Sequence, residues 1–360
     1  MFSSLRLLFS TQITENFYPL SFRFNCFQNK LAVVACASLM SLGACTQEQA
    51  AQDILTDPVS VSPDHNDPVT APDTALQVTD QEAAVIKDTS WQYPGPRPLA
   101  GAILPNKRIL AYYGNPLSKR MGILGEFPAD QMLQKLDEEV ARWQAADSTI
   151  PVQPALHAVV VTAQGSPGRG KKYRLRMTNK MIDGVLEMAK KRDAIVFLDI
   201  QVGHSTLQEE IPELASYLKL PNVHLGIDAE FAMHDGVVPG RKIGSFNADD
   251  INFASDYLAK LVKEHQIPPK LLIVHRFTQG MIRNTENIKL KPEVQIVMHM
   301  DGWGPPALKK DTFKRYIKNE PVQFTGFKIF YKNDTKNGSR LLTPEEVLAL
   351  TPTPMYIQYQ

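Results

Sequence analysis

The sequence predicts that residues 96–360 fold as an α/β domain of the (β/α)8 class, a TIM barrel. Three observations support this prediction. Short apolar runs alternate with amphipathic stretches of helical periodicity, as in parallel sheets built from βα units. Eight such runs occur over roughly 260 residues, which is the strand number and size of this barrel. Several runs end in polar residues, as expected of strands whose ends line one mouth.

The expected elements follow in chain order. The strands are Ile109–Tyr113, Leu156–Thr162, Ile195–Ile200, Val223–Ile227, Leu271–His275, Val294–Met300, Gly326–Tyr331 and Met355–Tyr359. Helical patterns lie at 129–146, 177–192, 206–219, 247–266, 279–288, 306–318 and 344–350. Asn247 is the expected N-cap of the helix at 247–266. Thr343, followed by Pro344, is the expected N-cap of the last helix.

A doubly wound open sheet is the main alternative fold. In its nucleotide-binding form, a Gly-rich phosphate loop follows the first strand. Here that strand is followed by Gly114-Asn115-Pro116, without such a loop. The barrel is therefore favoured.

The N-terminal region predicts export and a lipid anchor. Residues 29–44 join a basic flank to an apolar run too short to span a bilayer, as in a secretory signal peptide. The run ends in Leu42-Gly43-Ala44-Cys45, which resembles the lipobox of bacterial lipoproteins. The resemblance implies cleavage before Cys45, acylation of its sulfur (palmitate among the acyl chains) and attachment to the lipid bilayer. An ordinary cleaved signal with a chance cysteine is the alternative.

The remaining N-terminal segments complete the domain organisation. Residues 1–28 do not fit a signal peptide and are interpreted as an extension or a mis-called start. Residues 45–95 are interpreted as the lipidated cysteine and a disordered acidic tether, because they are rich in Asp, Thr and Pro and poor in aromatics. Thr46 after the cysteine favours the outer membrane if the host is Gram-negative. The barrel is then expected in the cell envelope, facing the periplasm or the exterior.

Composition excludes several function classes. The net charge of +1 gives no nucleic-acid-binding footprint. All three cysteines, Cys26, Cys36 and Cys45, precede the predicted barrel, which therefore has no disulfide, thiolate metal site or cysteine nucleophile. The absence of a G-x-S-x-G motif argues against a serine hydrolase of the elbow type.

The polar residues at the strand ends form the predicted site. The fourth strand closes on Asp228 and Glu230, whose i, i+2 spacing in a strand points both side chains to one face. The full set is Tyr113, Asn115, Asp199, Gln201, Asp228, Glu230, His275, His299, Asp301, Trp303, Lys328 and Gln358. Several carboxylates in one cavity repel and lose water, which raises at least one pKa toward the range of a general acid. A buried polar network, with Arg276 among the partners, is the alternative.

Two stretches resemble chitinase-like family 18 glycoside hydrolases. In that family the fourth strand ends in D-x-x-D-x-D-x-E, where the Glu is the acid and the nearest Asp orients the substrate. Here Asp228-Ala229-Glu230 supplies the last two acids, whereas Gly226 and Val223 replace the others. Met298–Gly304 is similar to the family's M-x-Y-D-x-x-G, with Met300 replacing the Tyr, and no Trp closes the eighth strand. The overall pattern also resembles secreted bacterial lipoproteins with barrel domains.

The resemblance implies a glycosidase-type barrel that acts on a carbohydrate polymer or oligosaccharide. Glu230 would protonate the leaving oxygen, and Asp228 would set its pKa and position the substrate or nucleophile. Asp301 or Asp199 would be the second carboxylate. Trp303, with Tyr112 or Tyr113, would stack on sugar faces, and the other residues of the set would contact substrate. No cofactor and no metal are assigned.

Two other functions stay open. A metal-dependent hydrolase could use His204, His275, His299, Asp228, Glu230 and Asp301 as ligands. The signatures of amidohydrolase barrels, His-x-His on strand 1 and Asp on strand 8, are both missing. A tethered barrel could instead bind envelope glycan or a partner protein without catalysis. The missing acids at 223 and 226 favour that last alternative.

Overall fold

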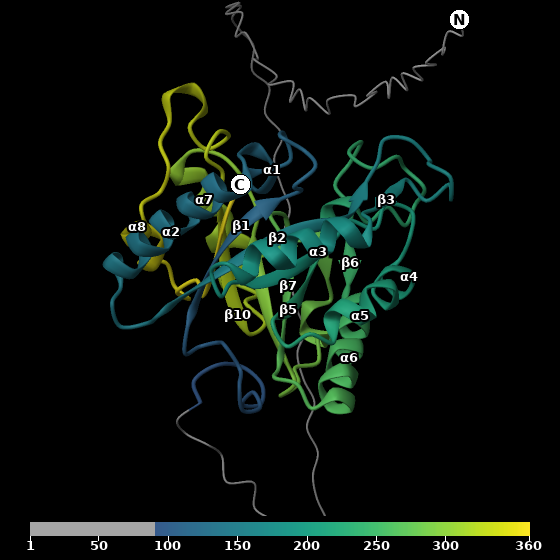
Figure 1. Cartoon of the computed structure of the whole chain (residues 1–360), viewed down its shortest axis with the longest axis horizontal. Helices are drawn as coiled ribbons and strands as arrows, with labels where there is room; N and C mark the ends of the chain where they lie inside the picture. The colour runs from purple at the N-terminus through teal and green to yellow at the C-terminus, as the bar shows by residue number, and fades with distance from the viewer. Residues whose placement is uncertain (1–90) are drawn as a thin grey trace, which may run out of the picture. The chain divides into compact units, whose positions relative to one another are not determined.

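The computed structural model describes residues 91–360 (Figure 1), which contain a closed barrel of eight parallel strands. These are β1 (Arg108–Gly114), β2 (Val152–Ala163), β4 (Ile195–Ile200), β5 (Val223–Asp228), β7 (Lys270–Arg276), β9 (Val294–Met300), β10 (Phe324–Ile329) and β11 (Tyr356–Tyr359). Each strand pairs in parallel with the next in this order, and β1 pairs with both β2 and β11, which closes the barrel. The predicted (β/α)8 class is confirmed. The predicted extension at 1–28, the predicted signal peptide at 29–44, Cys45 and the predicted tether as far as residue 90 lie outside the described residues.

The connections carry the helices and some smaller elements. The helices are α1 (Ile123–Glu126), α2 (Ala129–Ala146), α3 (Asn179–Lys190), α4 (Leu207–Glu210), α5 (Ala215–Leu218), α6 (Ala248–His265), α7 (Pro306–Phe313), continued by the π-helical η5 (Lys314–Lys318), and α8 (Pro344–Leu348). The 3-10 turns are η1 (Pro212–Leu214), η2 (Ala229–Phe231), η3 (Gln279–Met281), η4 (Thr285–Asn287) and η6 (Lys336–Gly338). The strand β3 (Arg174–Arg176) pairs antiparallel with β2, and β6 (Phe246–Asn247) pairs with β8 (Ile282–Arg283). Within 91–360, no helix combines the length and the apolar character needed to cross a membrane.

Local sequence signals explain most helix positions. Asn247 and Thr343 are N-caps as expected, and each forms a capping box with an acidic residue three positions on. The predicted helix at 279–288 is wrong, because that segment forms η3, β8 and η4 instead. Its backbone is held in two ways: the Arg276 guanidinium donates to the carbonyls of Thr278 and Gln279 at 3.3 and 3.2 Å, and β8 pairs with the distant β6. Such contacts override weak helical periodicity.

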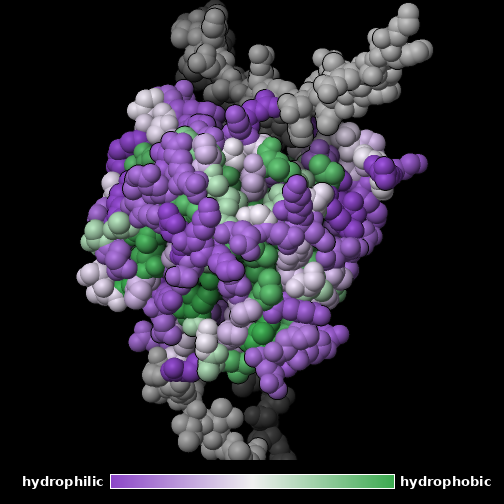
Figure 2. All heavy atoms as spheres, viewed as in Figure 1, coloured by the Kyte–Doolittle hydropathy of each residue, from purple (hydrophilic) through white to green (hydrophobic). Residues whose placement is uncertain are grey.

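The core consists of two sets of side chains, one between the strands and the helices and one inside the barrel. Alternate residues of each strand face outward and pack against the helices, as Leu110, Leu156 and Leu225 do. The others face inward and fill the lower barrel with apolar side chains, including Phe197 and Ile273. On the face drawn in Figure 2, hydrophilic residues cover most of the surface and hydrophobic ones show in small patches. Apolar burial therefore supplies the scaffold that holds the strands in place.

The segment before β1 closes the floor of the barrel. Trp91 and Tyr93 pack against Phe324, with ring centroids 6.2 and 4.7 Å away. Leu104 is buried in the same cluster, and its backbone N–H and C=O both bond to the Gln295 side chain, at 3.1 and 2.6 Å. The described end of the predicted tether, residues 91–95, thus includes aromatic rings packed on the barrel.

Above this floor the barrel interior becomes polar, and a glycine makes room for it. A Cβ on Gly226 would lie 2.5 Å from both Asp199 Oδ1 and His157 Nε2, inside their van der Waals radii. Position 226 is one of the two where the family 18 pattern carries an additional acid. In this chain the carboxylate of Asp199, on the neighbouring strand, occupies that space instead.

Replacing Gly226 by alanine is therefore expected to destabilise the fold by about 1–3 kcal/mol, the usual cost of overpacking a core. The matched control is Gly184→Ala in α3, where a Cβ meets nothing within 4 Å. That change should stabilise by about 0.5–1 kcal/mol, since alanine is the better helix former. Denaturant unfolding of the full chain measures both. Equal stability of Gly226→Ala and the wild type would contradict the close packing.

Candidate active site at the mouth of the barrel

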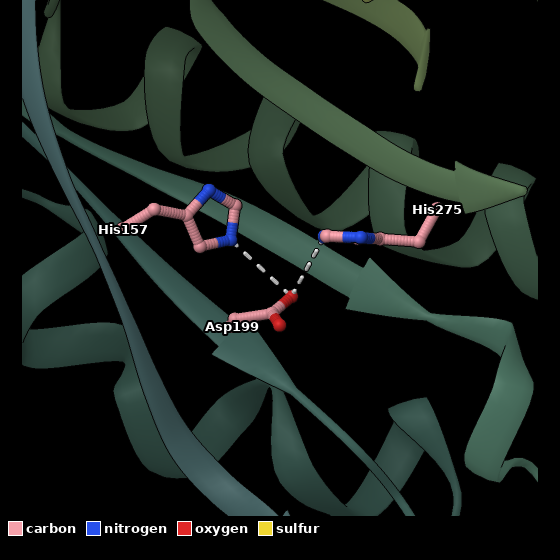
Figure 3. A group of neighbouring side chains, drawn as sticks. All are labelled: His157, Asp199 and His275. Atoms are coloured by element: carbon pink, nitrogen blue, oxygen red, sulfur yellow. Dashed lines mark ion pairs between the residues drawn. The ribbon is translucent and has the colours of Figure 1, made fainter. Parts of the chain in front are cut away.

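Asp199 lies at the centre of the polar interior. It is fully buried near the end of β4, and the Tyr113 hydroxyl donates to its Oδ2 at 3.2 Å. Nε2 of His157, on β2, and of His275, on β7, lie 3.4 and 3.6 Å from Oδ1 (Figure 3). Burial by itself would raise the pKa of Asp199, but the charge of His275 and the side-chain contact with His157 outweigh it and lower that pKa. Asp199 is therefore an ionised group neutralised by its neighbours.

Asp301 follows β9 directly and is held by two basic groups. His275 Nδ1 lies 2.7 Å from its Oδ2, and the Lys328 ammonium, on β10, lies 2.9 Å from its Oδ1. Against the opposing effect of burial, Lys328 and His275 hold the pKa of Asp301 well below its usual range. The Lys328 ammonium also lies 3.7 Å from the ring centroid of Tyr113. Asp301 is thus a fixed, ionised carboxylate.

Glu230 reaches the site through a turn. The strand β5 ends at Asp228, and Glu230 lies in η2, so the predicted strand alternation does not position it. Asp228 Oδ1 accepts the backbone N–H of Glu230 at 3.0 Å. The Gly244 N–H donates to the Glu230 carbonyl at 2.7 Å. These two hydrogen bonds hold the turn in place. The turn, and not the alternation of side chains along a strand, brings Asp228 and Glu230 to one site.

The pKa values of these two acids move in the direction opposite to those of Asp199 and Asp301. Burial, with the nearby charges of Asp228 and Asp301, raises the pKa of Glu230 to about 8. Burial also raises the pKa of Asp228, to about 6, although His275 opposes this shift. The Gln201 amide donates to Asp228 Oδ2 at 3.2 Å and accepts the Ala163 N–H at 3.2 Å. One mouth therefore holds carboxylates in two different protonation regimes near neutral pH.

The remaining predicted residues occupy different depths. Asn115 is buried and bonds to backbone, donating to the Val159 carbonyl at 3.1 Å and accepting the Leu117 N–H at 2.9 Å. His299 and Gln358 are fully buried inside the barrel. Trp303 is 45% exposed, with the Lys336 ammonium 5.0 Å from its ring centroid. Only Trp303 offers an exposed aromatic face.

The sequence analysis missed His157 and Tyr356. His157 Nδ1 lies 2.6 Å from the Tyr356 hydroxyl, which also accepts the Gln358 amide at 2.9 Å. Both residues lie near the starts of expected strands, whereas the predicted site consists of residues at strand ends. Inward alternation with Ala155 and Val159 is the signal that could have found His157.

His204 of the alternative metal set does not join this cluster. Its Nε2 lies 2.8 Å from the Val237 carbonyl, and its ring packs at 4.3 Å on Tyr173. The contacts of His204 are thus with the loops beyond β2 and β5. The predicted set of His204, His275 and His299 is therefore not brought together as a unit.

Comparisons with known proteins give only distant structural resemblances. No protein-family model matches the chain, and no curated protein matches it. Solved structures that resemble it include ZgEngAGH5_4 in complex with a cellotriose, at 11% identity and a TM-score of 0.33, covering 62% of this chain and 78% of that one. A GH5-4 broad specificity endoglucanase from Clostridium longisporum matches at 10% identity and 0.33, covering 62% and 75%. A ruminal GH26 endo-beta-1,4-mannanase matches at 11% and 0.33, covering 70% and 58%.

Likenesses at this TM-score carry no argument about activity. The barrel class is shown by the strand pairing of the chain itself, and the chemistry must be inferred from its side chains. The resemblance to family 18 stays a prediction.

The raised pKa of Glu230 can be measured directly. In a carboxyl-detected NMR titration of the full chain, the resonance lost in Glu230→Gln should titrate near pH 8. Asp228→Asn keeps an oxygen for the Glu230 N–H and removes the charge, so it should lower the pKa of Glu230. A Glu230 that titrates in the ordinary glutamate range, unaffected by Asp228→Asn, would contradict this description of the site.

Proposed function

We propose that the barrel is a glycosidase that cleaves envelope or extracellular carbohydrate, with Glu230 as general acid. The observation that carries this proposal is the contrast between two acids at one mouth: Glu230 lies in a turn beside Asp228, whereas Asp301 is paired with the Lys328 ammonium and with His275. Burial and neighbouring acids raise the pKa of Glu230 to about 8, whereas Lys328 and His275 keep Asp301 ionised. Pairs of acids pushed apart in this way supply one proton donor and one anion at the same pH.

Glycoside hydrolysis needs that combination. One carboxylic acid protonates the leaving oxygen, and an ionised carboxylate acts as nucleophile, as base or as a stabiliser of the positive charge that develops on the sugar. Glu230 is partly exposed and stays protonated through neutral pH, so it fits the first role. Asp301 fits the second, and Asp228 maintains the raised pKa of Glu230.

Asp199 is assigned a supporting role. It is fully buried, and its contacts are Tyr113, His157 and His275. Because one of these, His275, also holds Asp301, Asp199 positions the second carboxylate indirectly. In this proposal Asp199 acts through His275 and does not itself contact the reacting atoms. Asp301 is therefore preferred to Asp199 as the second carboxylate.

An exposed aromatic residue follows one of these acids closely in the sequence. Trp303 follows Asp301 by two residues and exposes its ring, whose flat apolar face suits the C–H face of a pyranose. Tyr113, by contrast, is buried and offers no exposed ring. We therefore assign sugar stacking to Trp303 alone.

The test is cleavage of peptidoglycan, chitooligosaccharides and α- and β-glucans by the full chain in mild detergent, followed as reducing ends. Glu230→Gln should slow cleavage by about 10²–10⁴-fold, the usual contribution of a general acid. Glu264→Gln, an exposed glutamate of α6, is the matched control and should retain full activity. A wild type that cuts no polymer, or a Glu230→Gln variant as active as the wild type, would contradict the proposal. Retention on a polymer without cleavage would favour a binding module.

We also propose that the chain is a lipoprotein of the cell envelope, anchored through Cys45. The support is the sequence Leu42-Gly43-Ala44-Cys45 after a short apolar run. Two or more acyl chains on one cysteine are enough for stable attachment to a bilayer.

Metabolic labelling with an alkyne-bearing palmitate tests the anchor. The wild type should be labelled and sediment with membranes, whereas Cys45→Ala should lose both properties. Cys36→Ala, which changes a cysteine inside the apolar run, is the control and should be labelled normally. Labelling of Cys45→Ala at the wild-type level would refute the assignment.

A further inference from the structure

We propose that His157, Asp199 and His275 form a binding site for a divalent transition-metal ion, with zinc as the ion that fits best. The inference does not depend on glycosidase activity, since it rests on the geometry of these three side chains. Their ligand atoms lie within 4.8 Å of one another and come from β2, β4 and β7 (Figure 3).

The three facing atoms lack hydrogen bonds. His157 Nε2, Asp199 Oδ1 and His275 Nε2 are buried and have no hydrogen-bond partner among residues 91–360. The two nitrogens lie 3.4 and 3.6 Å from the oxygen. An N–H···O bond is shorter, about 2.7–3.2 Å. Ligands in tetrahedral zinc coordination, each about 2.1 Å from the ion, are separated by about 3.4 Å. The two nitrogen–oxygen distances thus suit a bridging ion better than hydrogen bonds.

The opposite atom of each side chain is already used. Asp199 Oδ2 accepts the Tyr113 hydroxyl, and His275 Nδ1 pairs with Asp301. His157 Nδ1 lies 2.6 Å from the Tyr356 hydroxyl. Metal-binding histidines characteristically present one ring nitrogen to the ion while a carboxylate or other polar group orients the second. The three atoms left over therefore form a preorganised set.

The neighbouring strand leaves room at the same place. The Cβ that Gly226 lacks would lie 2.5 Å from two of the three proposed ligand atoms. Burying three polar atoms without hydrogen bonds is costly, and a cation would satisfy all of them at once. The donor set also defines the class of ion: imidazole nitrogens suit zinc and other late transition metals, whereas Mg²⁺ and Ca²⁺ prefer oxygen ligands.

An ion here would act on the mouth through His275. Coordination at Nε2 fixes the ring and leaves Nδ1–H to donate to Asp301, as in carboxylate–histidine–zinc arrangements. His275 would then be a positioning residue for Asp301. No residue spacing in the sequence indicates this set, since each ligand comes from a different strand.

The experiment measures metal in the full chain after prolonged chelation, because fully buried ligands exchange slowly. Reloading with Zn²⁺ alone should give one ion per chain by elemental analysis and raise the Tm, since ligand that binds only the folded state stabilises it. X-ray absorption at the zinc edge should show two imidazole ligands with oxygen. No zinc uptake, or a coordination shell of sulfur from Cys26, Cys36 or Cys45, would overturn the proposal.

Variants locate the ion. Asp199→Asn and His275→Gln should each weaken Zn²⁺ binding by at least about 100-fold, given the loss of a direct ligand. His224→Gln, at a buried barrel histidine whose Nδ1 accepts the Leu271 N–H, should bind normally. Unchanged binding in both ligand variants would place the ion elsewhere and refute the site. If circular dichroism shows that these variants fail to fold, the absorption spectrum of the wild type decides.

Discussion

The buried charge of Asp199 is the constraint from which the rest of the barrel interior follows. Removing a carboxylate from water costs several kcal/mol unless neighbouring groups replace the lost solvation. Three strands supply them: β1 gives Tyr113, β2 gives His157 and β7 gives His275. The neighbouring strand β5 contributes a glycine at this level. Gly226 has no side chain, and the space that a Cβ would need is filled by Asp199 and His157. A single acid thus explains both the polar layer and the glycine beside it.

The buried carboxylate of Asp199 is linked to the mouth of the barrel through a residue that it shares with Asp301. His275 contacts Asp199 on one side and Asp301 on the other, and Lys328 completes the pairing of Asp301. A second buried pair supports this arrangement. The Lys309 ammonium lies 2.6 Å from the Lys328 carbonyl and 2.8 Å from Asp334, which also accepts the Gly304 N–H at 2.9 Å. The segments after β9 and β10 are therefore held together next to the ionised Asp301. Glu230, by contrast, lies in a turn where burial and neighbouring acids disfavour its charged form.

The sequence predicted the barrel and most of its mouth because those features are local. Apolar runs, capping residues such as Asn247 and acids at strand ends are visible within a few positions. What it missed depends on contacts across the fold. His157 lies inside its strand, and its importance arises only where β4 and β7 bring Asp199 and His275 beside it. The helix expected at 279–288 was wrong because Arg276 and the pairing of β8 hold that segment in another shape. Glu230 was expected beside Asp228 through strand alternation, whereas in the structure a turn places it there.

The central claim is that one mouth keeps Glu230 protonated beside an ionised Asp301, and the pH profile of hydrolysis tests it most directly. The acid must be protonated to act, so kcat/KM on any polymer that is cut should fall about tenfold per pH unit above pH 8. That limb should move to lower pH in Asp228→Asn, because the charge that raises the pKa of Glu230 is gone. A profile without this limb, or a limb that Asp228→Asn leaves in place, would contradict the account.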